Sequence, residues 1–291
     1  MVERKQSMNF PFYYTTHNIM ADYTYRANDS TFLIVSLRDN IENNNWTGNG
    51  PMIEIDNGIH DTMNMEMKRK RKINMPTLDL YFSRQMKNNQ TIELNLVGQY
   101  SMSSYDNKLI YKSDTLIEEY PTYIENHGYS VSGEAMYTKA FDISELQFGI
   151  QYQHNFAYND YVVYDETTSM SKDNIYAYAQ YVTMLGEKAS LVLGTGAKVF
   201  VVNDGLNTLS YVKNLSTLRL NYKINKKMSL SAVASLSPSL PSLSDLSTIL
   251  QRTDDVSANV GNADLKPYNT LSGRLQFNYN APKIFYATAT A

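Results

Sequence analysis

Residues 217–236 read TLRLNYKINKKMSLSAVASL, and this stretch decides the fold class. Leu218, Leu220 and Tyr222 alternate with polar residues, and the same alternation resumes after the polar segment 225–227. Side chains of a strand point to opposite faces with a period of two, so each half has one apolar and one largely polar face. Two such strands joined by a short polar turn predict an antiparallel hairpin.

The same alternation recurs along most of the chain. The expected strands lie near 17–27, 31–38, 76–86, 91–104, 127–140, 145–158, 173–184, 189–202, 213–224, 228–237 and 269–280, with a partial strand at 283–290. Their polar faces carry Arg, Lys, Asn and Ser. A sheet with one lipid-like face and one wet face suits a transmembrane β-barrel. We therefore expect an all-β chain that forms an antiparallel transmembrane barrel sheet of eleven or twelve strands.

The connections between these strands alternate in length. The short turns are 28–29, 87–90, 142–144, 186–188 and 225–227. The long connections run near 39–75, 105–126, 159–172, 203–212 and 238–268. Short turns at one end and long loops at the other are typical of an outer-membrane barrel, with its periplasmic and extracellular ends. A soluble sandwich gives no reason for this alternation.

Length and composition narrow the class further. The 291 residues suit one large domain, and the net charge of −3 does not favour a nucleic-acid partner. No run reaches the roughly eighteen apolar residues of a membrane-spanning helix. Residues 1–14 lack the apolar core of a signal peptide, which indicates either a cytosolic protein or a chain that does not include its leader. The absence of Cys excludes disulfides and thiolate metal sites within the chain.

Aromatic residues mark one end of the predicted strands. Each strand that enters a short turn has one on its apolar face three to five residues earlier: Tyr25, Phe82, Tyr137, Tyr181 and Tyr222, with Tyr279 placed similarly before Ala281. In a barrel they would form a girdle at the periplasmic interface. The alternative is that Tyr, with 24 copies, is simply common in these strands.

No pattern of a catalytic, cofactor or metal site emerges. His17, His60, His127 and His154 share no ligand-like spacing, and solvated histidines explain them best. There is no nucleophile elbow, phosphate loop or zinc-protease helix motif. We therefore expect no enzyme, no cofactor and no resident metal.

Two local clusters remain open. Residues 68–72 read KRKRK; no aromatic residue lies among them to stack on bases, so a solvated rim that faces lipopolysaccharide phosphates is favoured over nucleic acid or a specific anion site. Upstream, Met63, Met65 and Met67 alternate with polar residues. They suit either a soft-metal site or one face of a hairpin that turns at 56–58, and we favour the hairpin.

The last third of the chain carries a more specific pattern. Gly261-Asn262-Ala263-Asp264-Leu265-Lys266-Pro267 stands directly before an alternating strand. It resembles the GNP-x-LKP signature before a late barrel strand of TonB-dependent outer-membrane receptors, with Ala263 in place of the usual proline. Pro241, Leu243 and Leu246 match the upstream P-x-L-x-x-L of the same family. Segments 76–84, 176–181 and 193–197 are similar to the family at the level of pattern, so the resemblance covers nearly the whole chain.

The resemblance implies a part of a receptor barrel. Barrels of this kind have about twenty-two strands, so we expect an open sheet with a lead-in segment or loop at 1–16 and a long extracellular loop at 238–268. It also implies uptake of a scarce large solute across the outer membrane of a Gram-negative bacterium. The implied partners are lipid, lipopolysaccharide and a TonB complex, which acts through a plug domain that this chain does not contain. The alternatives are a passive porin and a structural outer-membrane protein or adhesin.

Overall fold

The alternating segments pair into one antiparallel sheet. The computed structural model describes residues 2–7, 9, 11–56, 59–113, 117–203, 205, 207–246, 251–252, 258–262, 264–281 and 285–290. Its strands are β1 (Val2–Gln6), β2 (Phe12–Asn28), β3 (Thr31–Asp56), β4 (Ile59–Asn74), β5 (Thr77–Met86), β6 (Gln90–Lys112), β7 (Ile117–Ala140), β8 (Ser144–Tyr161), β9 (Glu166–Leu185), β10 (Ala189–Asn203), β11 (Thr208–Lys223), β12 (Met228–Ser239), β13 (Gln251–Arg252), β14 (Ala258–Asn259), β15 (Tyr268–Ala281) and β16 (Phe285–Thr290). A short 3-10 helix, η1 (Val162–Tyr164), and a short α-helix, α1 (Leu243–Leu246), complete it.

Fourteen strands form the main sheet, and β13 and β14 form a separate pair. These strands occupy twelve positions across the sheet, because two positions each hold two strands end to end. β1 and β2 both pair with β3 and together form one edge, and β4 and β5 together fill the position between β3 and β6. The break between β5 and β4 lies at Met75 and Pro76, and Pro76 has no N–H to give to the ladder. The predicted antiparallel sheet of eleven or twelve strands is confirmed.

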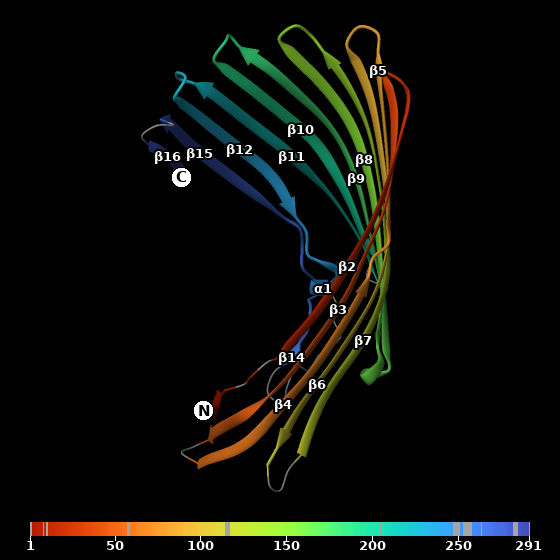
Figure 1. The fold of residues 1–291 in the computed structure, drawn as a ribbon, viewed down its shortest axis with the longest axis vertical. Coiled ribbons are helices and arrows are strands. Elements are labelled where there is room, and N and C mark those ends of the chain that lie inside the picture. Colours follow the sequence, from red (N-terminus) through yellow and green to blue (C-terminus); the bar gives the residue numbers. More distant parts are fainter. Residues whose placement is uncertain are drawn as a thin grey trace.

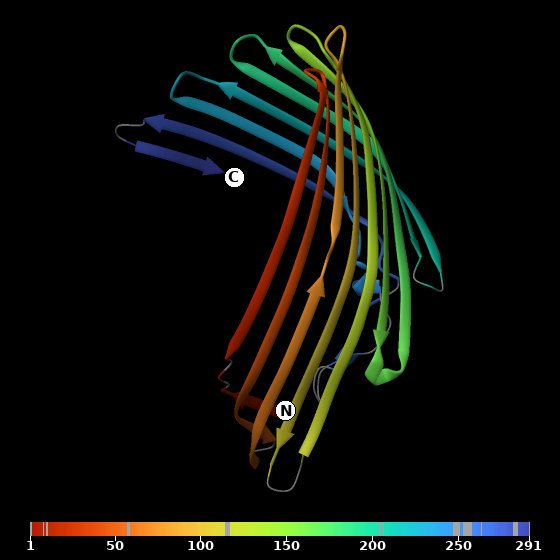
Figure 2. The ribbon, with the colours of Figure 1, turned by 45° about the vertical axis from the view of Figure 1, so that its right-hand side comes forward.

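The sheet is a curved open wall. Figures 1 and 2 show β2 at one edge and β16 at the other, and the described residues contain no pairing between these two strands. The prediction of an open sheet is therefore confirmed. No helix in the described part of the chain has the length and apolar character to cross a membrane.

The short turns lie together at the upper end of the wall in Figure 1, and local chemistry explains them. Between β5 and β6, Asn88 and Asn89 have φ of 61° and 54°, the left-handed pair of a tight hairpin turn that Asn tolerates. Gly186 has φ of 68° between β9 and β10. Between β11 and β12, Asn225 Oδ1 accepts hydrogen bonds from the Lys227 and Met228 backbone N–H groups at 2.8 and 3.0 Å.

Three expected long loops are wrong, because they are largely strand. The segment 39–75 forms the end of β3 and all of β4, 105–126 extends β6 and β7, and 159–172 extends β8 and β9. Backbone hydrogen bonds continue the ladder through these extensions whatever their side chains are, so the strands do not depend on a regular apolar alternation. The segment 1–16 was expected to be a lead-in segment or loop, but it holds β1 and the start of β2.

The strand extensions form a projecting arm, which we define as residues 41–56 of β3, β4, 102–112 of β6 and 117–127 of β7. Its base is the row Ile41, Asn74, Met102 and His127, whose members are cross-strand partners. The arm points downward in Figure 1, away from the short turns. Its sixteen residues of β3 reach roughly 50 Å at about 3.3 Å per residue.

Exposure distinguishes the two faces of the wall. Side chains diverge on the convex face of a curved sheet and converge on the concave face. On β10, Leu193 is 42% exposed and Thr195 is exposed, whereas Lys198 is half-buried and Phe200 is 2% exposed. The apolar positions that include Leu193 therefore lie on the convex face, and the polar positions lie on the concave face.

Candidate functional site

The predicted division of residues between two faces is confirmed in register, and contact of the apolar face with lipid stays a prediction. Leu218 pairs with Ala234, Leu220 with Ala232, and Leu275 with Ala232 from the other side, so these residues share the convex face. The polar partners lie on the concave face: Arg219, Asn221, Arg274 and Gln276. Leu218 and Leu275 are 43% and 51% exposed, as expected for side chains that face lipid rather than a protein core.

All six predicted girdle residues lie on the convex face. They are Tyr25, Phe82, Tyr137, Tyr181, Tyr222 and Tyr279, and each is linked by cross-strand pairing to apolar convex residues. Leu33, for example, pairs with both Tyr25 and Phe82. Their role as an interfacial girdle stays a prediction.

A second aromatic row lies nearer the arm. Tyr100 pairs with Tyr129 and Tyr129 with Phe156, and the last two rings stack at 5.3 Å. This row is eight residues from the paired Tyr137 and Phe148 on β7 and β8. This second row was not predicted from the sequence, although Tyr129 and Tyr137 are an even number of residues apart on one strand and therefore share a face. Eight residues on a strand tilted by about 40° span roughly 20 Å, close to the height of an outer-membrane apolar band.

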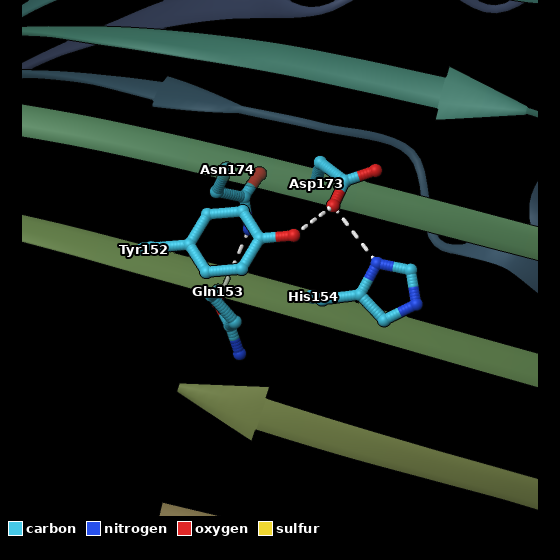
Figure 3. A network of polar contacts seen from close by, with 5 residues as sticks. All are labelled: Tyr152, Gln153, His154, Asp173 and Asn174. Atoms are coloured by element: carbon cyan, nitrogen blue, oxygen red, sulfur yellow. Dashed lines mark hydrogen bonds and ion pairs between the residues drawn. The ribbon is translucent and has the colours of Figure 1, made fainter. Parts of the chain in front are cut away.

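The close-up in Figure 3 shows polar contacts on both faces between β8 and β9. On the convex face, Asp173 Oδ1 accepts a hydrogen bond from the Tyr152 hydroxyl at 2.7 Å and lies 2.8 Å from His154 Nδ1. On the concave face, Asn174 Nδ2 donates to Gln153 Oε1 at 3.1 Å. The convex cluster lies beside Tyr129, whose ring is 5.4 Å from His154, so its polar groups satisfy one another next to the aromatic row.

The histidine predictions have mixed outcomes. His17 and His127 are exposed, as expected for solvated residues, and the side chain of His60 lies outside the described residues. His154 is not simply solvated, because it is held by Asp173 and Tyr129. Within the described ranges, no three His, Cys, Asp or Glu side chains gather as metal ligands would.

The structure brings the two halves of the resemblance motif together. Leu243 and Leu246 bound α1, and the Asn262 backbone N–H donates to Asp245 O at 2.7 Å. Ser242 and Asp245 cap α1 reciprocally: the Ser242 backbone N–H donates to Asp245 Oδ2 at 2.9 Å, and the Asp245 backbone N–H donates to Ser242 Oγ at 3.2 Å. The remaining motif residues are Pro241, Gly261, Leu265, Lys266 and Pro267. Leu246 and Pro267 are buried, so the motif closes the loop 238–268 at its base.

Hydrogen bonds from the Ser242 hydroxyl and backbone hold the pKa of Asp245 below its usual value. Ala263, the departure from the family pattern, lies outside the described residues. In this chain the motif therefore has a structural role: it holds the loop between β12 and β15, whose paired ends are Ser239 and Tyr268.

The methionines lie on the concave face of the arm. Met63, Met65 and Met67 share one face of β4, and Met52 pairs directly with Met63 across the hairpin. The hairpin interpretation is supported by the pairing of Asp56 with Ile59, while Asn57 and Gly58 lie outside the described residues. Met52 and Met65 are 1% and 2% exposed and pack with Leu109 and Tyr111, so these thioethers form a small apolar core.

The basic cluster divides between the two faces. Arg69 pairs with Trp46, which places Arg69 and Arg71 on the concave face, while Lys68, Lys70 and Lys72 lie on the convex face of the arm. The convex side also carries ion pairs: Lys108 with Glu119 at 2.6 Å and Lys112 with Glu66 at 2.7 Å. Lys112 lowers the pKa of Glu66 by its hydrogen bond. A uniform solvated rim is thus wrong for Arg69, whereas Arg71 is exposed.

Arg69 is held between two aromatic rings. Its Cζ lies 5.0 Å from the centroid of Trp46 and 5.7 Å from that of Tyr105. Its Nε donates a hydrogen bond to Asn107 Oδ1 at 3.3 Å, and Asn107 is buried. Phe12 continues the stack, with its ring 5.6 Å from Trp46. Periodicity cannot reveal this arrangement, since it depends on how β2, β3, β4 and β6 align.

Two grooves of the described residues lie away from this stack. One of about 560 Å³ is lined by Leu193, Leu218 and Leu236, and one of about 660 Å³ by Ile19, Leu37 and others. Their apolar lining lies on the convex face, where acyl chains would fill them in a membrane. The arm and the concave wall therefore remain the candidate site for a solute.

Solved structures of outer-membrane receptors share this fold. The chain aligns with the copper transporter OprC at a TM-score of 0.62 and 13% identity, over 98% of this chain and 53% of that one. It aligns with the ferric-catecholate import receptor Fiu from E. coli K12 at 0.60 and 9% identity, over 94% and 55%. For FpvA from P. aeruginosa, solved with pyoverdine and iron, the values are 0.58, 9%, 99% and 52%.

No family model matches the chain, and no curated protein does. At identities of 9–13%, the likeness establishes the fold. The chain spans about half the length of each of these structures. It therefore has the barrel fold of the TonB-dependent outer-membrane receptors.

Proposed function

We propose that this chain forms part of the barrel of an outer-membrane receptor that takes up a scarce large solute. The energy would come from a TonB complex that acts through a plug domain. The observation that carries the proposal is the concave face, which continues from the barrel wall into the arm and presents the ordered Arg69 stack. A wall of this kind separates lipid on its convex side from solute on its concave side.

The names of the structural neighbours support a transport role. OprC is described as a copper transporter and Fiu as a ferric-catecholate import receptor. We propose the same compartment for this chain, the outer membrane of a Gram-negative bacterium, with lipid and lipopolysaccharide around its convex face. A passive porin built from this chain alone is not favoured, because that needs β2 to pair with β16, and the described strands show no such pair.

Energy dependence tests the proposal. Cells that express the protein from its own gene are compared with cells that lack the gene, and solutes lost from the medium are measured by mass spectrometry. We expect at least one solute too large for passive pores to be depleted only by expressing cells, and only until a protonophore collapses the inner-membrane gradient. Depletion that persists with the protonophore, or steady ion conductance of the purified protein in planar bilayers, would instead indicate a passive pore.

A further inference from the structure

Two adjacent cross-strand rows place aromatic, amide and guanidinium groups together on the concave face of the arm. Phe12, Trp46 and Arg69 form the first row, and Tyr14, Asn44 and Arg71 form the second. We name these six residues the mouth patch. Cross-strand partners stand side by side on one face, so the patch is continuous across β2, β3 and β4.

Arg69 is preorganised to bind an anion. Trp46 and Tyr105 hold the guanidinium between their rings, and Asn107 fixes its Nε. A guanidinium has five N–H donors, and the described residues supply an acceptor only to Nε. The remaining donors suit the two oxygens of a carboxylate or phosphate, which Arg binds in bidentate fashion.

Arg71 supplies a second, free cation on the same face. It is two residues from Arg69, which places the two backbones roughly 7 Å apart along β4. Arg71 is exposed, and the described part of the chain gives it no ion pair. Glu42, in the next row toward the barrel, accepts a hydrogen bond from Asn40 Nδ2 at 3.0 Å. Because the side chains of β4 alternate between the two faces, its arginines lie on the concave face and its lysines on the convex face.

Asn44 offers a hydrogen-bond acceptor beside Arg71, one of seven buried side-chain oxygens of the described residues without a partner. The residue is 8% exposed, and its Oδ1 has no hydrogen-bond partner among the described residues. Buried acceptors in proteins are nearly always satisfied. Asn44 is the cross-strand partner of Arg71, so a bound hydroxyl next to an oxyanion would satisfy both residues. Phe12 and Tyr14 are 54% and 50% exposed and offer apolar surface to a ring.

We infer that the mouth patch binds an acidic saccharide. Its carboxylate lies on Arg69 and Arg71, a neighbouring hydroxyl donates to Asn44 Oδ1, and the sugar ring contacts Phe12 and Tyr14. The catechol oxygens of a ferric tris-catecholate are deprotonated and bound to iron, so they give Asn44 no hydroxyl donor, and a neutral sugar leaves both guanidinium groups without a counter-ion. This inference names the solute class for the proposed uptake function and rests on it for its physiological meaning.

Direct binding tests the inference without requiring transport. Outer membranes from cells that express the protein from its own gene are titrated with fluorescent oligogalacturonate. Parallel titrations use a neutral malto-oligosaccharide of equal length and a ferric tris-catecholate complex. Arg71→Gln, at an exposed side chain, should weaken oligogalacturonate binding about tenfold, the effect of one lost charge-assisted hydrogen bond. Arg69→Gln should weaken it at least as much.

Lys70→Gln is the matched control, because it removes one positive charge between the two arginines but on the opposite face. It should change binding less than twofold, and an immunoblot of each membrane preparation confirms equal protein. Equal loss in Lys70→Gln and Arg71→Gln would overturn the inference in favour of general charge attraction. So would equal binding of the neutral sugar, or tighter binding of the ferric complex.

Uptake separates this inference from the proposed function. Energy-dependent uptake of another solute, without oligogalacturonate binding, overturns the mouth patch and leaves the receptor role intact. Oligogalacturonate binding that Arg71→Gln weakens about tenfold, in cells without energy-dependent uptake, supports the patch and contradicts the receptor role.

Discussion

Neighbouring residues of one strand lie on opposite faces of the sheet, and we expect one face to meet lipid and the other to meet water. Leu220 lies on the convex face of β11 and Asn221 on the concave face. Leu220→Arg should lower the free energy of unfolding in lipid vesicles by about 2–4 kcal/mol, because it buries a charge in hydrocarbon near the midplane. Asn221→Arg should cost far less. Denaturant titration of the protein expressed from its own gene measures both, and equal losses would contradict the assignment of faces.

Gly149 shows how closely the concave face is packed. A Cβ at this position would overlap Cζ of Tyr178, whose hydroxyl donates to Glu134 Oε1 at 2.7 Å. Gly149→Ala must displace the ring and break that bond, so we expect a loss of about 1–3 kcal/mol in the free energy of unfolding.

Gly133 is the matched control for this substitution. It lies on the convex face of the neighbouring strand, where a Cβ meets Leu96 at an ordinary 3.7 Å. Gly133→Ala should change the free energy of unfolding by less than about 0.5 kcal/mol. A similar cost for the two variants in the same denaturant titration would show that the concave face is not the crowded one.

At the scale of elements, the sequence predicts the strands of the apolar band because alternation is required there. Residues 213–223 lie within β11 and 228–237 within β12, Ile224 lies just beyond the end of β11, and the turn is where Asn225 predicts it. Of the arm, the sequence predicts mainly the hairpin that turns at 56–58, because most arm residues are polar or charged and lack the regular apolar alternation of the wall. The mouth patch escaped prediction for another reason: Trp46 and Arg69 meet only through strand register, which composition does not encode.

The loop 238–268 offers a pH-dependent element. Ser242 lowers the pKa of Asp245, so the capped form gains stability above the ordinary Asp pKa and loses it as pH falls through the lowered value. Protection of the Asn262 amide, which donates to Asp245 O, should therefore decrease between about pH 5 and pH 2. Hydrogen exchange read by mass spectrometry measures it.

Asp245→Asn provides the control for the loop. The variant cannot titrate at this position, so its Asn262 protection should be lower at neutral pH and should not change in acid through this group. A pH response of the same size in the variant would assign the effect to another group.

At the scale of the whole molecule, the two ends of the wall should face different compartments. The chain contains no Cys, so single cysteines can be placed at Asn49 in the arm and at Lys226 in a short turn. On intact cells, an impermeant maleimide should label Asn49→Cys and not Lys226→Cys, and permeabilised cells should label both. Labelling of Lys226→Cys alone on intact cells would reverse the orientation.

The sheet of the described residues is open, since β2 does not pair with β16. An open sheet in a bilayer leaves edge N–H and C=O groups unpaired at several kcal/mol each, so these strands need partners beyond their own pairing. The alternation of apolar and polar residues predicts each strand but does not predict that the sheet stays open. The number of strand positions indicates the open sheet, because it is about half of the about twenty-two strands in large receptor barrels.

The most direct test is gel migration of the 291-residue chain alone, refolded in detergent, with cysteines at Tyr23 in β2 and Ala287 in β16. A closed barrel runs faster unheated than boiled, resists protease and would bring β2 and β16 together. We expect no fast-running band, protease sensitivity and no intramolecular disulfide. A fast-running, protease-resistant band that contains the Tyr23–Ala287 cross-link would show that this chain closes on itself as a small pore, and would contradict the open sheet.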